Sequence, residues 1–104
     1  MSTITLGSFI KLLESVDSSK VVSMSLGNLH SFRGDPTHLA ISSQSESTVQ
    51  EMLNEARSAV GKEFISYKDG NYLMDLNTEI HFAFYGSMDE CPEWFPMFVN
   101  KLFS

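Results

Sequence analysis

Two segments of the chain carry the apolar spacing of three and four residues that is typical of an amphipathic helix. The first begins near the N-terminus, where Thr5 can act as the N-cap. The second begins near Thr48, which forms a capping-box pair with Glu51, and Ser47 with Gln50 offers the same pattern one residue earlier. It ends before Gly61, which suits a left-handed C-terminal cap. The apolar positions are Leu6, Phe9, Ile10, Leu13 and Val16 in the first helix and Val49, Met52, Leu53, Ala56 and Val60 in the second. We expect both helices to bury these positions in one core.

Between the predicted helices, two short segments alternate apolar and polar residues as half-buried strands do. Residues 21–26 form the first segment, and residues 38–42 form the second, in which Leu39 and Ile41 should face the core. The intervening residues 27–37 include two glycines, a proline, an asparagine and an aspartate, and these residue types interrupt helices and central strands. The pattern therefore predicts a strand, an ordered loop and a second strand.

The segment after the second helix predicts a β-hairpin and one further strand. Residues 64–67 and 72–74 flank Asp69-Gly70, a dipeptide that is preferred in the two-residue type I′ turns of hairpins. A second turn near residues 75–77 leads into a strand over 79–85. In this strand one face should hold Ile80, Phe82 and Phe84, and the other His81, Ala83 and Tyr85.

The last part of the chain, residues 88–104, is a tail in which aromatic side chains crowd together. Pro92 can start a short helix there, and Pro96 should interrupt it. The complete order of elements is α-β-β-α-β-β-β-α, and the sequence shows neither an internal repeat nor a second domain. We therefore expect a single α+β domain over 1–104, with two or three helices packed on a mostly antiparallel sheet of about five strands.

Composition limits the classes of function. The chain has 104 residues, of which 42% are hydrophobic and 19% are charged, and these values are typical of one folded domain. Seven basic and thirteen acidic side chains give a net charge of -6, which argues against direct binding to nucleic acid or to an anionic membrane. The sequence has one cysteine, Cys91, and no apolar run of membrane-spanning length. We therefore expect a cytosolic protein that needs no disulfide, metal or other cofactor.

Two motif blocks follow one another along the chain. The first is His30-Ser31-Phe32-Arg33-Gly34 with Leu39-Ala40-Ile41, and the second is Gly61-Lys62, Phe64, Tyr67-Lys68, Gly70, Tyr72, Met74, Thr78 and Tyr85-Gly86. Over residues 4–86 this pattern resembles that of a family of small proteins encoded by tailed bacteriophages. Phe32 stands where tyrosine is more usual, and the aromatic tail is not part of the shared pattern. The resemblance implies phage origin, a compact α+β domain and a place in the cytoplasm of the bacterial host, but it implies no reaction.

Arg33 is the first candidate for ligand binding. Its guanidinium offers five donors in a planar fork, which suits phosphate or carboxylate, and Gly34 lets a ligand or another backbone approach closely. Ser31 and nearby amides add further donors, and His30 and Phe32 belong to the same candidate site. The alternative is that Arg33 pairs with an internal carboxylate or carbonyl and holds a long loop in shape.

A second cation with aromatic neighbours lies at the predicted hairpin. Tyr67, Lys68 and Tyr72 surround the turn, and aromatic faces beside a lysine suit a nucleobase and its phosphate. His81 and Tyr85 share a strand face that could form a polar wall of a pocket. The alternative is ordinary cross-strand pairing beside a solvated lysine.

The sequence offers little for catalysis. His30, His38 and His81 lack metal-ligand spacing, and the acidic neighbours of Cys91 disfavour the thiolate that a nucleophile needs. Paired carboxylates at a fixed spacing are also missing, as is a glycine loop that cradles phosphate before a helix. An enzyme, such as a nucleotide hydrolase with His30 or His81 as its base, is therefore the least favoured class.

The aromatic tail predicts a homo-oligomer. It carries more apolar side chains than a short helix on a small sheet can readily bury, and Pro96 should keep them from forming one stripe. The interface would comprise Trp94, Phe95, Met97, Phe98, Leu102 and Phe103. The alternative is that the tail covers an open sheet face of its own domain.

The favoured function is non-catalytic. A phage protein with these loops can bind and sequester a small anionic host signalling molecule of nucleotide type, and so act as a counter-defence protein. The alternative is a protein–protein inhibitor that blocks a host defence enzyme through the aromatic tail or the acidic surface. Neither function requires a cofactor or a membrane.

Overall fold

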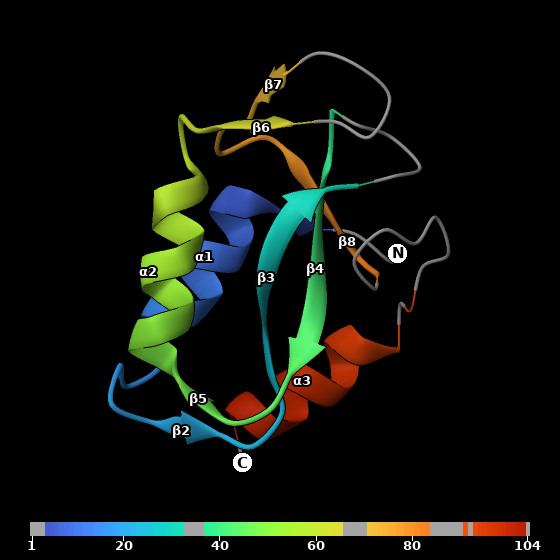
Figure 1. The fold of residues 1–104 in the computed structure, drawn as a ribbon. Coiled ribbons are helices and arrows are strands. Elements are labelled where there is room, and N and C mark those ends of the chain that lie inside the picture. Colours follow the sequence, from blue (N-terminus) through green and yellow to red (C-terminus); the bar gives the residue numbers. More distant parts are fainter. Residues whose placement is uncertain (1–3, 33–36, 66–70, 84–90, 92, 104) are drawn as a thin grey trace.

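Three helices and eight strands make up the part of the chain that the structure, a computed structural model, describes: residues 4–32, 37–65, 71–83, 91 and 93–103. In chain order the elements are β1 (Ile4–Thr5), α1 (Leu6–Glu14), β2 (Val21–Val22), β3 (Ser25–Ser31), β4 (Leu39–Gln44), β5 (Ser47–Thr48), α2 (Val49–Ala59), β6 (Glu63–Ile65), β7 (Asn71–Leu73), β8 (Glu79–Phe82) and α3 (Trp94–Leu102). The predicted α+β class and the mostly antiparallel pairing are confirmed (Figure 1).

The main sheet has four strands in the order β1-β8-β4-β3. β1 pairs with β8 and β3 pairs with β4 in the antiparallel sense, whereas β4 and β8 run parallel. Because neighbouring parallel strands need a long crossover connection, α2 and the β6–β7 hairpin lie between β4 and β8 along the chain. β2 and β5 form a further two-stranded ladder.

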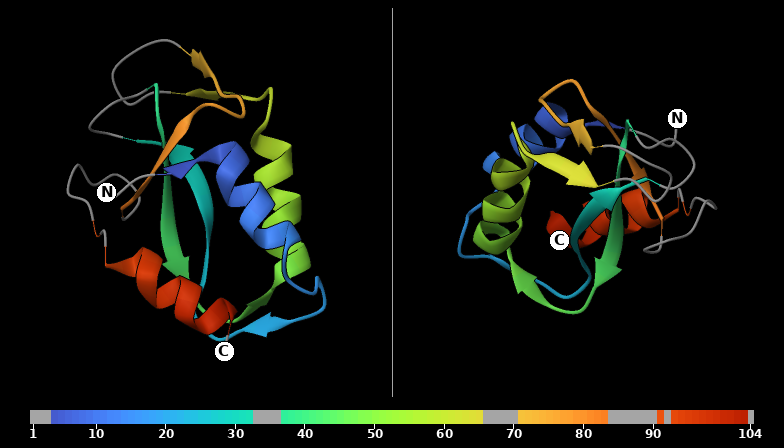
Figure 2. Two further views of the ribbon diagram at one scale, coloured as in Figure 1. Left: turned by 180° about the vertical axis from the view of Figure 1, so that it is seen from behind. Right: turned by 45° about the horizontal axis from the view of Figure 1, so that its top comes forward.

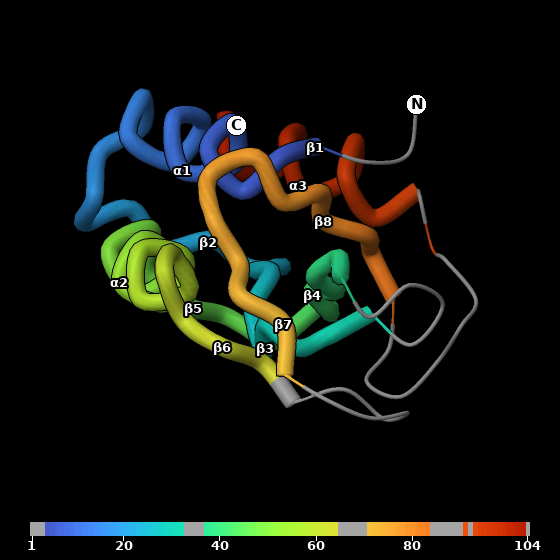
Figure 3. Tube along the Cα trace, turned by 90° about the horizontal axis from the view of Figure 1, so that it is seen from above, coloured from blue at the N-terminus to red at the C-terminus, as the bar shows by residue number. Residues whose placement is uncertain are grey.

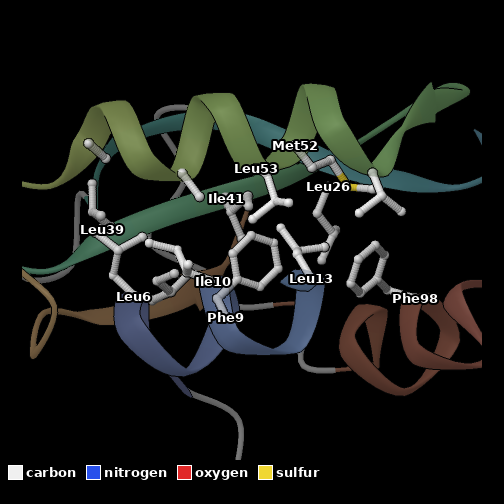
Figure 4. Close-up of a cluster of buried hydrophobic side chains, with 14 of the residues drawn as sticks. Leu6, Phe9, Ile10, Leu13, Leu26, Leu39, Ile41, Met52, Leu53 and Phe98 are labelled. Carbon is white, nitrogen blue, oxygen red and sulfur yellow. The ribbon is translucent and has the colours of Figure 1, made fainter. Parts of the chain in front are cut away.

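The core lies between the main sheet and the helices. α1 and α2 pack side by side on one face of the sheet (Figures 1 and 3). α3 crosses the end of this layer (Figure 2), where Phe98 lies with its ring centroid 6.0 Å from that of Phe9. Figure 4 shows the buried cluster, to which β4 and β8 contribute Leu39, Ile41, Ile80 and Phe82. Val16 follows the end of α1 and is only partly buried against this core.

The predicted caps of the first two helices are confirmed. The Thr5 hydroxyl accepts a hydrogen bond from a backbone N–H of the first turn of α1, and the capping box of Thr48 and Glu51 is complete in both directions. Gly61 has a φ of 77°, which is the left-handed conformation expected of it. Placing Val60 in the core was wrong, because α2 ends one residue earlier and the extended Val60 is 38% exposed.

The predicted loop over 27–37 is wrong for its first part, because β3 continues to Ser31. Asn28 has a φ of 57°, and the β3–β4 register shifts between Gly27 and His30. These are the features of a β-bulge, in which one extra residue is inserted into a strand. The residue types that suggested a loop therefore mark an irregularity inside a strand.

The β6–β7 hairpin is confirmed, but its register differs from the predicted one. Phe64 pairs with Tyr72, and the last pair of the ladder leaves residues 66–70, five residues, between the two strands. A regular two-residue turn at Asp69-Gly70 would instead place Tyr67 opposite Tyr72. Asp69-Gly70 itself lies outside the described residues.

α3 is a continuous helix, so the predicted interruption near Pro96 is wrong. Pro96 lies in the first turn, where a backbone N–H has no acceptor within the helix, so the proline costs no hydrogen bond there. Within the described ranges the longest helix is α2, with 11 residues, and no helix has the length and apolar character to cross a membrane.

The regular geometry of α3 places Phe98 and Leu102 one turn apart on its inner face, where both are 0% exposed. These two residues therefore belong to the core of the chain itself and are unavailable to an oligomer interface. This agrees with the alternative prediction, in which the tail covers its own domain. Trp94 and Phe95 are partly buried against the same core. Of the six predicted interface residues, Met97 and Phe103 remain exposed, at 48% and 56%.

Candidate functional site

The face of the main sheet that points away from α1 and α2 carries the candidate site. On this face Ala40 of β4 lies between its cross-strand partners His30 of β3 and His81 of β8. Partners in a ladder share a face, and side chains alternate along each strand. We call this surface the second face; its residues are His30, Phe32, His38, Ala40, His81 and Ala83.

The bulge in β3 turns the end of that strand toward the second face. Extending the register that β3 has before the bulge would place Leu29 opposite Ala40 and would turn Phe32 toward the helices. The extra residue at Asn28 places His30 opposite Ala40 instead. Phe32, two positions further, therefore reaches the second face, where it is 5% exposed and packs with two alanines.

Phe32 and His81 form a face-to-face ring stack. Their centroids lie 4.1 Å apart, and the angle between the ring planes is 13°. β3 ends just before Phe32, and β4 lies between β3 and β8 in the sheet, so the two rings reach each other across β4. The stack thus forms over β4 from residues 49 positions apart, since 81 − 32 = 49.

His38 meets His81 edge to edge. The His38 Nδ1 and His81 Nε2 atoms are 2.9 Å apart, the ring centroids are 5.1 Å apart, and the planes differ by 17°. The centroid separation exceeds the nitrogen separation by about two ring radii, so both nitrogens lie close to the line that joins the centroids. The two imidazoles are therefore nearly coplanar, and their in-plane lone-pair directions point at each other, which is the geometry of an N–H···N hydrogen bond.

Glu79 lies at the outer side of His38, with its Oε2 atom 3.5 Å from His38 Nε2. One of the two facing nitrogens donates and the other accepts, according to the tautomers of the two rings. The His38 end of the row reaches solvent, since the side chains of His38 and Glu79 are 26% and 49% exposed.

The structure brings only some of the predicted site residues together. Phe32 and His81 are in contact, and His30 lies on the same face with its Nδ1–H donating to the Asn28 carbonyl at 2.6 Å. Ser31 was wrongly grouped with them: it pairs with Leu39, so it turns toward the helices and is 4% exposed. Tyr72 lies opposite Phe64 in the hairpin, packed against the main core. The predicted residues outside the described ranges are Arg33, Gly34, Tyr67, Lys68 and Tyr85.

His38 is the residue that the sequence analysis missed. It was treated as one of three isolated histidines, because it lies 43 positions from His81. One signal was present: His38-Leu39-Ala40 and His81-Phe82-Ala83 repeat the same pattern of histidine, large apolar residue and alanine. Two strands with that pattern, once adjacent, place both histidines beside small side chains on one face.

Two hollows between β3 and α2 offer a less suitable site for an anion. Their volumes are about 280 Å³ and about 260 Å³, and Glu55 contributes to both. The larger one also contains Glu51, so carboxylates dominate its lining. In the smaller one Lys62 Nζ lies 5.2 Å from the centre of the Phe64 ring, which places a cation beside an aromatic face. Glu51 and Glu55 make the larger hollow unfavourable for phosphate, whereas Glu55 and Lys62 balance each other in the smaller one. The second face differs from both hollows in its stacked aromatic rings.

The described residues provide no metal centre, since no three of their His, Cys, Asp and Glu side chains gather around a common point. Cys91 is partly buried, and its backbone N–H donates to the carbonyl of Phe82. Comparisons of the chain with protein-family models, with curated proteins and with solved structures find no match. No family or relative thus points to catalysis.

Proposed function

We propose that this protein binds a small anionic ligand of nucleotide type at the second face and does not transform it. The observation that carries the proposal is the row of rings formed by Phe32, His81 and His38. The His38 end of the row is partly open to solvent and suits contact with a nucleobase, and imidazole N–H groups can donate hydrogen bonds to its phosphate.

Arg33 supports the proposal through its position in the sequence. It is the residue that follows Phe32 in the sequence. The charge of the whole chain, -6, repels anions at long range. The affinity for an anionic ligand must therefore come from local cations, and only seven lysines and arginines are present in the whole sequence.

In its biological setting, the proposed activity is that of a sponge. The phage-like motif blocks suggest a protein made inside a bacterial host, where sequestering a nucleotide signal would silence a defence system. Such a protein needs binding at stoichiometric levels and no turnover, which agrees with a site built from stacked rings and donors.

The test is a titration of the full chain with a panel of mono-, di- and cyclic nucleotides, followed by calorimetry. Arg33→Ala should weaken binding at least tenfold, because a charge-assisted bidentate contact contributes about 1.5–3 kcal/mol. Arg33→Lys should restore little, since the planar fork is lost. Lys62→Ala is the matched control, because it removes a cation beside an aromatic ring in a different place.

The result that contradicts the proposal is binding that survives Arg33→Ala and is lost in Lys62→Ala, or a panel in which no nucleotide binds. Circular dichroism of each variant checks the fold. An Arg33→Ala chain that unfolds would instead favour the alternative in which Arg33 holds its loop in shape.

A second candidate function, inhibition of a host protein, is favoured by the outer surface of α3. Met97 and Phe103 are about half exposed to solvent, at 48% and 56%. The same pair is what remains of the proposed homo-oligomer interface. Light scattering of the full chain and of a Met97→Ser/Phe103→Ser variant tests self-association: a full-length chain that is monomeric at high micromolar concentration contradicts the oligomer.

A further inference from the structure

We infer that the larger hollow between β3 and α2 is a binding site for a guanidinium group. The group belongs either to a small guanidinium compound or to an arginine side chain of a partner protein. The volume of about 280 Å³ lies at the lower end of the size of ligand pockets, so the bound group is small. The inference goes beyond the proposed function, because the hollow shares no residue with the second face and takes a ligand of opposite charge.

The polar side chains of the hollow offer acceptors for hydrogen bonds. Glu51 and Glu55 lie one turn apart on α2, and Gln44 and Ser47 add an amide and a hydroxyl oxygen. Among the described residues that line the hollow there is no lysine, arginine or histidine. A complementary ligand must therefore bring both hydrogen-bond donors and a positive charge.

The charge of the two carboxylates is not neutralised within the described part of the chain. Arg57, the basic residue of α2, pairs instead with Glu14 of α1, at a distance of 2.8 Å between nitrogen and oxygen. Glu51 accepts the Thr48 backbone N–H at 2.9 Å in the capping box and faces the partial positive charge of the helix N-terminus. Glu55 lies one turn further along the helix, outside the capping box, and is therefore the principal anchor for a cation.

A buried oxygen at the hollow lacks a partner. Ser47 Oγ is shielded from water and has no hydrogen-bond partner among the residues that the structure describes. A buried hydroxyl in this state costs free energy, and most such atoms in proteins are satisfied. A ligand N–H that enters the hollow can satisfy this oxygen, so Ser47 points to a donor from outside the chain.

Gly27 gives its space to the Gln44 side chain in the wall of the hollow. A Cβ atom at position 27 would lie 2.5 Å from Gln44 Oε1 and 2.7 Å from its Cδ, closer than non-bonded atoms approach. The Gln44 amide therefore packs directly on the backbone of β3. This glycine lets the amide lie in the wall, where its oxygen adds a further acceptor.

The floor of the hollow favours a guanidinium over an ammonium group. Leu26 and Met52 are buried and supply apolar surface between the acceptors. A guanidinium is planar and weakly hydrated, and it carries five donors in its plane, so it can lie on apolar surface and still donate to several acceptors around it. An ammonium is compact and strongly hydrated, and it would lose more of its hydration at the same place.

The experiment is a titration of the full chain, uniformly labelled with ¹⁵N, with n-butylguanidinium, followed by NMR. We expect saturable shifts of the backbone amides of Leu26 and Gly27 and of the side-chain amide of Gln44. n-Butylammonium at equal ionic strength should bind more weakly. The peptide Gly-Gly-Arg-Gly-Gly with blocked ends distinguishes the two sources of the group. Tighter binding than that of n-butylguanidinium indicates an arginine of a partner protein, and weaker binding indicates a small compound.

Four variants test the role of the lining residues. Glu55→Gln should weaken binding roughly fivefold or more, because it removes the charge of the principal anchor. Glu51→Gln should weaken it less, and glutamine at that position can still form the capping box. Glu63→Gln is the matched control, since it removes one negative charge from β6 outside the hollow. Ser47→Ala should weaken binding but keep or raise Tm of the ligand-free chain, because the oxygen that it removes is buried without a partner.

The inference is overturned if n-butylguanidinium causes no saturable shift at the hollow. It is also overturned if Glu63→Gln weakens binding as much as Glu55→Gln does, since the attraction would then come from the net charge of -6. Equal binding of n-butylammonium would overturn the choice of a guanidinium. None of these results involves an anion or Arg33, so a nucleotide panel without binding would contradict the proposed function and leave this site standing.

Discussion

Phe98→Ala should be among the most destabilising substitutions in this chain. Phe98 is 0% exposed, lies on the inner face of α3 and has its ring centroid 6.0 Å from that of Phe9. Truncation of a buried phenylalanine costs about 3–5 kcal/mol, since the lost transfer free energy adds to that of the cavity left behind. The tilted pair with Phe9 accounts for about 0.5–1.5 kcal/mol of such a loss.

That cost is large for a small domain. The free energy of unfolding of a typical domain is about 5–15 kcal/mol, so a loss of about 3–5 kcal/mol is a large share of the total stability. Each kcal/mol lowers Tm by roughly 4–8 °C in a chain of this size, and Phe98→Ala should therefore lower Tm by more than about 12 °C. Phe103→Ala is the matched control: it removes the same ring from the end of the same helix, but the residue is 56% exposed.

Urea denaturation and thermal melts of the parent and both variants, followed by circular dichroism, measure the difference. The control should remain within about 0.5 kcal/mol of the parent, as is usual for surface substitutions. A Phe98→Ala chain that melts within a degree or two of the parent would refute the placement of α3 in the core. If Tm of the parent rose with protein concentration and Phe98→Ala removed that rise, the helix would belong to an interface between copies.

Three further predictions concern the scaffold. Phe82→Ala should cost about 3–5 kcal/mol in urea denaturation, because Phe82 is 0% exposed on the inner face of β8; a near-parental midpoint would contradict the β8 register. Thr48→Ala should cost about 1 kcal/mol, because it removes the hydroxyl that caps the Glu51 N–H, and an unchanged midpoint would show that the cap contributes nothing. Two hydrogen bonds from Ser19 lower the pKa of the Asp17 carboxyl below its usual 3.8. The stabilisation that these hydrogen bonds give the fold is therefore present above pH 3.8 and is lost as pH falls through the lowered pKa. The carboxyl ¹³C shift measures this pKa, and Asp17→Asn should remove the pH dependence.

The helices could be predicted from the sequence because their signals are local. Thr48, Glu51 and Gly61 define the ends of α2 through contacts within one or two turns, and the apolar stripes follow the helical period. The predicted break at Pro96 was wrong because the effect of a proline depends on its position in the helix, and a start at Trp94 places Pro96 in the first turn, where it breaks no hydrogen bond. An error of a few residues in a predicted helix start thus changes the predicted shape of the whole tail.

The site could be predicted only in part because it depends on pairing between distant strands. Phe32 and His81 were recognised as candidates from their types and neighbours, but the contact between them exists only because the β3 bulge rotates Phe32 to the second face. A glycine and an asparagine near residue 28 are equally compatible with a loop and with a bulge. His38 requires in addition that β4 and β8 lie side by side, and no local pattern specifies that partnership.

The position of β8 has a consequence for how the chain folds during synthesis. β8 is one of the last elements of the sequence, yet it lies between β1 and β4, and it pairs Ile80 with Ile4 across 76 positions, since 80 − 4 = 76. A nascent chain therefore presents the bare hydrogen-bonding edge of β4 until residues 79–82 have left the ribosome. Contacts so distant in sequence slow folding, because a long loop must close before they form. The chain that still lacks β8 is accordingly the form most exposed to strand-mediated aggregation.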